Sequence, residues 1–249
     1  MAGSVRDQVT QWTTVAGERA LHRIERYIER SSLVETTPFL SPASFPWAAK
    51  LEENWKTIRT ELEDVLSFQE SLPNFQDIST DQKELTDDDR WKTFFFYGYG
   101  FRSDANCERC PKTAGLLARV PGMTTAFFSI LAPHKQIPSH RGPWKGVIRY
   151  HLALMIPEPA DQSGIEVGGE VRHWVEGGSL FFDDSYEHRA WNDTDATRVV
   201  LFMDVLRPLR RPAADLNKGI IKAIGYSPFI QDAKRRHNAW EQRFEKLRK

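Results

Sequence analysis

Residues 147–155, Val-Ile-Arg-Tyr-His-Leu-Ala-Leu-Met, decide the fold class of this chain. Side chains alternate between the two faces of a strand, so the large apolar residues gather on one face while Arg149 and His151 lie on the other. If the apolar face packs against helices, Arg149 and His151 point into the mouth of a β-barrel. An inward arginine needs a partner, and the strand has no acidic residue on that face, so we expect a bound carboxylate there. Simple solvent exposure of this face is the alternative.

Short runs of β-branched or aromatic residues, bounded by Gly, Pro and Asn, occur on both sides of this strand. Many short strands with turns and no helices between them are typical of a β-sandwich or jelly roll. The runs predict strands at residues 91–99, 125–131, 170–175, 179–182 and 197–206.

Helical periodicity is confined to the two ends of the chain. Apolar residues recur at the spacing of one helix face over residues 5–28 and 46–66, and again after Pro212. We therefore expect a mainly β protein with flanking α-helices in one structural unit. Its parts are N-terminal helices over residues 1–90, a β-core over residues 91–210 and C-terminal helices over residues 211–249.

The overall composition excludes few classes of protein. The chain of 249 residues has 34 Lys and Arg against 34 Asp and Glu, so no net charge favours nucleic-acid binding. No apolar run reaches the ~18 residues of a membrane span, and no secretory signal is visible at the N-terminus. These features predict a cytoplasmic protein without a transmembrane segment. Basic clusters at residues 234–237 and 246–249 leave peripheral membrane contact open, although a solvated helix face is the simpler interpretation.

Cys107 and Cys110 form a Cys-x-x-Cys pair. The sequence has no second pair to complete a zinc site, and it lacks the βαβ context of a redox dithiol. Structural thiols are the simplest interpretation, with a redox or metal role as the alternative.

Two histidines, His140 and His188, each lie beside strand-like sequence. Neutral imidazole is a common ligand for Fe(II), and open sites of this kind are typical of non-haem oxygenases. The usual His-x-Asp pattern would place a carboxylate two residues after His140, where this chain has Gly142. Taken singly, each histidine is more simply an ordinary surface or core residue, so the hypothesis depends on the joint pattern with the inward arginines. The remaining histidines are interpreted as structural: His22, His134, His173 and His237.

Arg198 is the second inward arginine. His188 and Arg198 are nearly equidistant from the centre of a turn rich in Asn, Asp and Thr. In an antiparallel hairpin they would face each other with Cβ atoms on the order of 5 Å apart. Because a guanidinium group binds a carboxylate through two parallel hydrogen bonds, this pair predicts an anionic ligand that bridges a metal and Arg198.

Residues 46–208 contain, in order, a set of motifs that resembles the aspartyl/asparaginyl β-hydroxylase family of Fe(II)- and 2-oxoglutarate-dependent oxygenases. The motifs are His140-x-Gly142-Pro143, Ile148-Arg149-Tyr150-His151-Leu152, Trp174-x-Glu176-Gly177, Phe182-Asp183-Asp184-Ser185-x-x-His188, Asn192 and Arg198-Val199-Val200-Leu201.

The resemblance implies a double-stranded β-helix, which is a cupin-like jelly roll. It also implies iron held by His140 and His188 alone, and Gly142 matches the absence of a carboxylate ligand. Arg198 with Ser129 would bind the distal carboxylate of 2-oxoglutarate.

Two further roles follow from the same resemblance. Arg149 and His151 would lie near the end of 2-oxoglutarate that chelates the metal. Asp184 is a candidate for ordering a metal-bound water, with a plain turn carboxylate as the alternative.

The implied reaction is hydroxylation of an unactivated C–H bond, with Fe(II), 2-oxoglutarate and O2 as cofactor and co-substrates. The substrate that we expect first is an Asp or Asn residue of a peptide or protein. Alternatives are a lipid acyl chain, of the lipid A or ornithine-lipid type, and a small metabolite. More remote alternatives are an iron halogenase, with a halide in the position left by Gly142, and a non-catalytic jelly-roll binding module.

Overall fold

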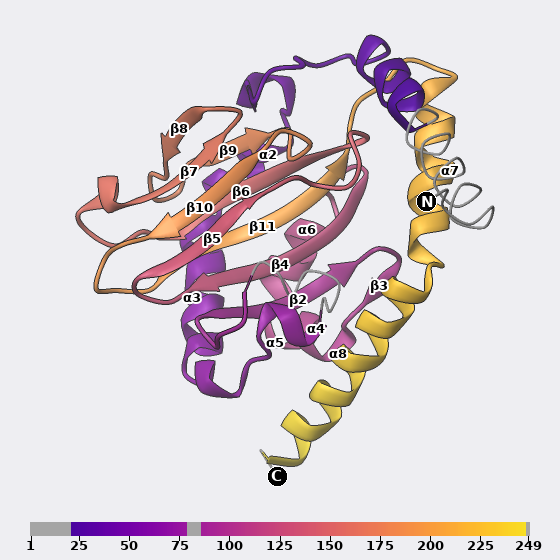
Figure 1. The fold of residues 1–249 in the computed structure, drawn as a ribbon. Helices are drawn as coiled ribbons and strands as arrows, with labels where there is room; N and C mark the ends of the chain where they lie inside the picture. The colour runs from indigo at the N-terminus through magenta and orange to yellow at the C-terminus, as the bar shows by residue number, and fades with distance from the viewer. Residues whose placement is uncertain (1–20, 79–85, 248–249) are drawn as a thin grey trace, which may run out of the picture.

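The computed structural model describes residues 21–78 and 86–247 (Figure 1). Its strands form two antiparallel sheets, with the orders β1-β9-β6-β11-β4-β2-β3 and β5-β10-β7-β8. The strands are β1 (Phe39–Leu40), β2 (Trp91–Gly98), β3 (Phe101–Arg102), β4 (Met123–Leu131), β5 (Lys135–His140), β6 (Val147–Met155), β7 (Ser163–Val167), β8 (Glu170–His173), β9 (Ser179–Phe182), β10 (His188–Asn192) and β11 (Arg198–Leu206).

Helices precede, interrupt and follow the strands. Residues 21–30 are helical, and the rest of the helix predicted for residues 5–28 lies outside the described residues. Within the described residues, no helix is both long enough and apolar enough to cross a bilayer. The named α-helices are α2 (Ala48–Glu53), α3 (Trp55–Leu66), α4 (Phe75–Ile78), α5 (Asp104–Arg109), α6 (Pro111–Leu117), α7 (Ala213–Gly225) and α8 (Pro228–Leu247).

The inner faces of the two sheets pack against each other. One cluster of buried side chains joins the small sheet to the large sheet. The two facing antiparallel sheets (Figure 1) make the cupin-like jelly roll that the sequence predicts. From the small sheet the cluster takes Ile137, Ile165, Val167 and Ala190, and from the large sheet Phe127, Leu131, Ala153 and Val200.

The outer face of the large sheet is covered by helices. Tyr150 and Leu152 of β6 belong to one buried cluster with Ile58 and Leu62 of α3. Burial of each such aliphatic side chain stabilises the fold by about 2 kcal/mol, and a shift of one residue would turn every side chain of β6 to the wrong face. The apolar face of residues 147–155 therefore packs against helices as expected, and the opposite face points between the sheets.

Two predictions about helices are wrong. Short helices α5 and α6 lie between β3 and β4, where the sequence predicted only turns. The hydroxyl of Ser103 caps α5 and Pro111 opens α6, but each helix is too short to show a periodic apolar face. The helix predicted for residues 46–66 is divided at Asn54, whose side-chain amide donates to the carbonyl of Lys50 (2.8 Å).

The Cys-x-x-Cys pair lies on the two inserted helices. Both thiols are free and buried, with Cys107 2% exposed and Cys110 0% exposed. Burial raises the pKa of both thiols, and a raised pKa disfavours the thiolate that redox and metal chemistry require. This environment suits structural thiols.

Candidate active site

His140 and His188 lie directly opposite each other at one end of the small sheet. β5 ends at His140, β10 begins at His188, and the antiparallel register pairs these two residues. The centroids of their rings are 4.1 Å apart. Two histidines distant in the sequence are thus cross-strand neighbours, as a site with two imidazole ligands requires.

Both imidazoles are held in one tautomer. Nδ1 of His140 lies 2.8 Å from the carbonyl oxygen of Pro138, and Nδ1 of His188 lies 2.9 Å from that of Tyr186. A carbonyl oxygen only accepts, so Nδ1 carries the proton and Nε2 keeps the lone pair that a metal needs. Burial lowers the pKa of both rings, that of His188 to about 3, so both are neutral near pH 7. Nε2 of His188 is buried without a hydrogen-bond partner.

Asp184 fills the space beside Gly142. A Cβ atom built on Gly142 would overlap the Asp184 carboxylate, and the Gly142 N–H donates to the Asp184 carbonyl (2.7 Å). The Asp184 side chain is 1% exposed, and its Oδ1 has no hydrogen-bond partner. The structure thus has a buried carboxylate close to the position where a His-x-Asp motif would project one, supplied from a different segment of the chain.

Arg149 does not lack an acidic partner, so the expectation that it needs a bound carboxylate is wrong. Its Nε and Nη2 donate to Asp204 (2.9 and 3.2 Å), and its Nη2 also lies 2.8 Å from Oδ2 of Asp184. β6 and β11 are neighbours in the large sheet, with Arg149 and Asp204 in register. The strand's own face has no carboxylate, but the adjacent strand supplies one.

Two buried carboxylates share this single guanidinium. Burial, with repulsion from Asp204 and Asp183, raises the pKa of Asp184 to about 7 against the opposing attraction of Arg149. A second ion pair, between Asp183 and Arg207, is fully buried beside it and fixes the loop that carries Asp184. Asp184 is thus poised to change its protonation state near neutral pH.

The predicted hairpin between His188 and Arg198 is also wrong. β10 belongs to the small sheet and β11 to the large sheet, so the turn between them carries the chain from one sheet to the other. The side-chain amide of Asn192 holds this turn. It donates to three backbone carbonyls, those of Leu131, Ala132 and Ala196, at 2.8 to 3.1 Å.

Arg198 is a buried cation without an acidic partner among the described residues. Its side chain is 1% exposed, and its Nε and Nη1 have no hydrogen-bond partner. The guanidinium carbon lies 4.6 Å from the ring centroid of Trp174. Burial lowers the pKa of Arg198 to about 9. A lone buried charge costs several kcal/mol, so this site favours an anion that enters from outside.

Ser129 and His151 lie on the same inner face as Arg198. The register pairs Leu131 with Arg198 and Ser129 with Val200, so Ser129 is the next inward residue of β4. Its hydroxyl accepts from Nε1 of Trp91 (3.1 Å) and keeps its own proton to donate. Both ring nitrogens of His151 are buried without partners, and burial, then repulsion from Arg198, holds its pKa well below the usual value.

Polar atoms without partners are therefore concentrated on this inner face. Folded proteins leave few buried polar groups unpaired, so such a group of atoms indicates a ligand site. The donor set fits a divalent metal at the two Nε2 atoms and a carboxylate at Arg198. Within the described residues, no group of three or more His, Cys, Asp or Glu side chains offers a fuller metal site. The unpaired atoms that this site brings together belong to Arg198, His151, Trp174, His188 and Asp184, and other unpaired atoms belong to Asn74, Gln76, Thr125 and His237.

Three of the other four histidines have partners that suit the expected structural role, whereas both ring nitrogens of the buried His237 lack a hydrogen-bond partner. His22 lies 3.3 Å from Glu25, and His134 lies 3.0 Å from Asp195. Nδ1 of His173 lies 2.9 Å from a backbone carbonyl. His237 is buried on α8 against aromatic rings.

Sequence reasoning did not assign roles to Asp204, Asp183 and Arg207. The signal for Asp204 was available, because it follows Arg198 at even spacing on one strand face. The sequence did not reveal that β6 pairs with β11, which is the pairing that places Asp204 opposite Arg149. The ion pair between Asp183 and Arg207 joins segments that no local pattern connects.

The sequence matches the family model described as Aspartyl/Asparaginyl beta-hydroxylase over residues 52–208. The chain is 50% identical over 207 residues to the ornithine lipid ester-linked acyl 2-hydroxylase of Rhizobium tropici, covering 83% of this chain and 74% of that protein. It is 32% identical over 167 residues to the human aspartyl/asparaginyl beta-hydroxylase, covering 65% of this chain but only 21% of the human protein.

Among solved structures, the Cupin_2 domain of an XRE family transcriptional regulator from Enterobacter cloacae is 14% identical, with a TM-score of 0.33. The match covers 47% of this chain and 96% of that domain. This similarity is too weak to support an argument. The family model matches more than half of the chain, and the Rhizobium relative aligns over most of both proteins. These two sequence matches show that the chain belongs to the aspartyl/asparaginyl beta-hydroxylase family.

Proposed function

We propose that this protein is an Fe(II)- and 2-oxoglutarate-dependent dioxygenase that hydroxylates an acyl chain of a lipid. The observation that carries the proposal is the buried guanidinium of Arg198, which has unpaired N–H groups on the same inner face as His151. The ring of His151 lies within electrostatic reach of both Arg198 and His188. A dianion such as 2-oxoglutarate would reach from a metal at one end to an arginine at the other.

Each group of the site has a role in this proposal. Nε2 of His140 and Nε2 of His188 would hold the iron, and Arg198 with Ser129 would bind the distal carboxylate of 2-oxoglutarate. Bound iron, 2-oxoglutarate and O2 supply the oxidising power that places a hydroxyl group on an unactivated carbon. The apolar walls between the sheets exclude water from this reaction.

Arg149 and Asp184 would act beside the metal rather than on it. The guanidinium of Arg149 fixes the Asp184 carboxylate, whose Oδ1 is left free to accept a hydrogen bond from a ligand or to hold a proton. The same carboxylate argues for hydroxylation over halogenation. The Asp184 side chain fills the space that the missing ligand leaves beside Gly142, and in its ionised form it would also repel a chloride ion.

The lipid substrate is favoured over the peptide that the sequence led us to expect first. The Rhizobium relative acts, by its name, on an ester-linked acyl group, and it is 50% identical. The relatives named for aspartyl and asparaginyl residues are more distant, at 32% identity. An acyl carbon of an ornithine lipid is accordingly the first substrate to test.

The test is incubation of the purified protein with ornithine lipid, Fe(II), 2-oxoglutarate and air, followed by mass spectrometry of the lipid and assay of succinate. We expect a lipid heavier by one oxygen atom, formed with an equal amount of succinate. Arg198→Met should abolish both products, whereas Arg172→Met, at an exposed arginine of β8, should change neither. Oxygen incorporation into peptides but not lipids would refute the lipid assignment.

A further inference from the structure

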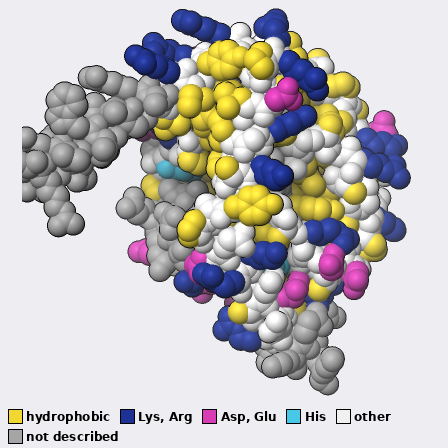
Figure 2. All heavy atoms as spheres, turned by 90° about the vertical axis from the view of Figure 1, so that its right-hand side faces the viewer, with side chains coloured by type: hydrophobic (Ala, Val, Ile, Leu, Met, Phe, Trp, Pro, Cys, Tyr) yellow, Lys and Arg dark blue, Asp and Glu magenta, His cyan; other side chains and the backbone are white. Residues whose placement is uncertain are grey.

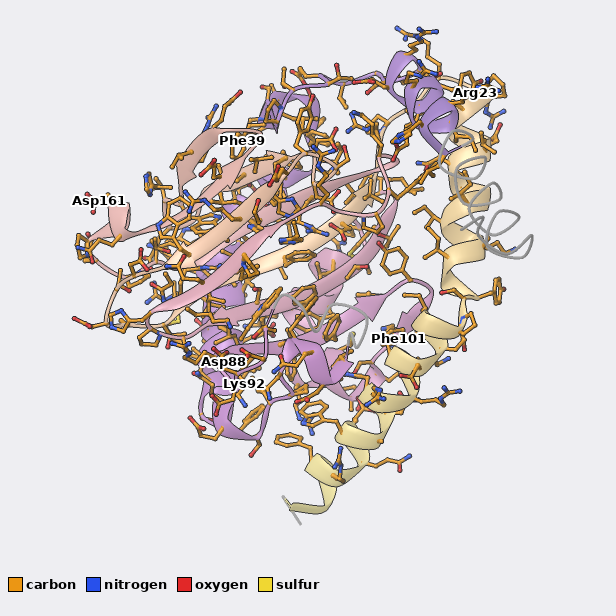
Figure 3. All side chains as sticks on the ribbon, viewed as in Figure 1. Arg23, Phe39, Asp88, Lys92, Phe101 and Asp161 are labelled. Atoms are coloured by element: carbon orange, nitrogen blue, oxygen red, sulfur yellow. The ribbon has the colours of Figure 1, made fainter. Side chains whose placement is uncertain are left out.

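A groove of about 540 Å³ lies between the β2–β3 turn, one end of β4 and β11, and the helices α7 and α8. We call it the α7–α8 groove. Its walls are apolar, with Met123, Leu206, Ile221 and Ile230 among the lining residues. Phe101 also lines it and lies next to α8 (Figure 3), where its ring centroid is 5.8 Å from that of His237.

The rim of this groove is positively charged. Lys218 and Lys222 lie one helical turn apart on α7, and Lys234 faces them from α8. All three lysines are exposed, and none forms an ion pair with another described residue. The described residues that line the groove include no Asp or Glu. The rim therefore complements an anionic surface.

The chemistry of the surrounding face matches that of the groove. Figure 2 looks onto the side that carries α7 and α8, where hydrophobic side chains are interspersed with many Lys and Arg and with fewer Asp and Glu. Tyr226, at the C-terminal end of α7, lines the groove and is 73% exposed. Tyrosine is enriched where proteins meet the headgroup region of a bilayer, because its ring is apolar and its hydroxyl polar.

Tyr99, in the wall of the groove, interacts electrostatically with carboxylates of the candidate active site. It lines the groove from the β2–β3 turn, with a positive φ of 35° and its N–H donating to the carbonyl of Thr124 (2.7 Å). Burial, and then the charges of Asp204 and Asp184, raise the pKa of its hydroxyl. The hydroxyl thus lies within electrostatic reach of the carboxylates that Arg149 holds.

We infer that the α7–α8 groove docks this protein onto the surface of a bilayer that contains anionic phospholipid. The inference rests on the proposed lipid substrate, because an enzyme that hydroxylates an acyl chain must meet that chain in a membrane. A soluble anion is a poorer occupant. The lysines are exposed and spread along two helices, and the walls between them are apolar rather than hydrogen-bonding.

The experiment is sedimentation of the full-length protein with two kinds of vesicle. One kind contains phosphatidylcholine only, and the other contains equal parts of phosphatidylcholine and phosphatidylglycerol. The variant carries Lys218→Glu, Lys222→Glu and Lys234→Glu. The control carries Lys50→Glu, Lys56→Glu and Arg119→Glu, which make the same change of charge at exposed positions of the α2, α3 and α6 region.

We expect wild type and control to bind the anionic vesicles and not the neutral ones. Each lysine near an anionic surface contributes about fivefold to binding, so the loss of all three should weaken binding on the order of 100-fold, and the glutamates that replace them should weaken it further. Tyr226→Ser should weaken binding without changing its dependence on salt. Thermal melts of all variants would test whether unfolding causes any loss of vesicle binding. Equal binding to both kinds of vesicle, or wild-type binding by the groove variant, would overturn the inference.

A second readout separates docking from catalysis. The groove variant should hydroxylate ornithine lipid dispersed in detergent at the wild-type rate, and the same lipid in anionic vesicles far more slowly. An equal loss of hydroxylation rate with both forms of lipid would contradict docking. It would indicate that the three lysines contact the reacting lipid directly. If wild type binds anionic vesicles through these lysines but oxidises no lipid in either form, the docking surface stands and the proposed function fails.

Discussion

The Asp184 carboxylate occupies the space into which a side chain on Gly142 would project. Arg149 holds this carboxylate from the other side, at 2.8 Å. The residue that looks like a gap in a metal-binding motif is thus glycine because a carboxylate from the segment before His188 already fills the site. Gly142 and Asp184 are two parts of one arrangement.

We expect Gly142→Ala to destabilise the protein by about 1–3 kcal/mol, because the new methyl group overlaps Asp184 and the surrounding groups are buried. The free energy of unfolding in urea measures this effect. Gly219→Ala on α7 is the control. Its added Cβ would meet open space, and the higher helix propensity of alanine should stabilise the protein slightly, by up to about 1 kcal/mol. Equal effects at both positions would refute the packing argument.

Arg198→Met should leave the metal-free protein as stable as wild type, or more stable by about 1–3 kcal/mol, because it removes a buried charge that no described carboxylate compensates. The same variant should lose 2-oxoglutarate binding. Thermal melts in a chelator and calorimetric titration with 2-oxoglutarate test the two halves. A strongly destabilised variant would show that the charge of Arg198 is already compensated within the protein, so that no ligand is needed to stabilise it.

Arg207→Met should cost about 3–5 kcal/mol, since it leaves the fully buried carboxylate of Asp183 without its partner. Arg211→Met breaks an exposed pair with Asp215 and should cost less than about 1 kcal/mol. Urea unfolding compares the two variants. Similar costs would mean that burial of the first pair contributes nothing to its strength.

Metal affinity should rise with pH between about pH 6 and pH 8, by up to tenfold per pH unit below the pKa of Asp184. That pKa is raised to about 7, so below it the carboxyl group holds a proton that a nearby cation must displace. The histidines contribute less to the trend, because burial lowers the pKa of both rings, that of His188 to about 3. Asp184→Asn should give a flat profile in anaerobic Fe(II) titrations. A variant that kept the wild-type slope would assign the proton to another group.

The sequence predicted much of the large sheet, because its strands are continuous apolar runs or alternate cleanly. β4, β6 and β11 are examples, and the inward direction of Arg149 and His151 follows from alternation alone. β5 was not predicted, and β10 was expected only as one arm of a hairpin with β11, which is wrong. They are short, mix Pro, Arg and Lys with few apolar residues, and bury only alternate side chains. Yet these two strands are the ones that bring His140 and His188 together.

The partners of the arginines could not be predicted for a different reason. The turn at Asn192 was interpreted as a hairpin because two strands joined by a short turn usually pair. Here it crosses between sheets, so Arg198 lies opposite Leu131 and not His188. Pairing between strands distant in the sequence decides which charges meet, as for Arg149 and Asp204. Local sequence patterns do not indicate which distant strands pair.

We propose that the protein uses His140, His188 and Arg198 to couple oxidation of 2-oxoglutarate to hydroxylation of a lipid acyl chain. The most direct measurement supplies isotopically labelled O2 to the purified protein with Fe(II), 2-oxoglutarate and ornithine lipid, and determines where the label goes. We expect one labelled oxygen atom on the acyl chain and one in succinate, and neither with the His140→Ala, His188→Ala variant. Unlabelled lipid together with labelled succinate whose formation depends on a peptide would contradict it.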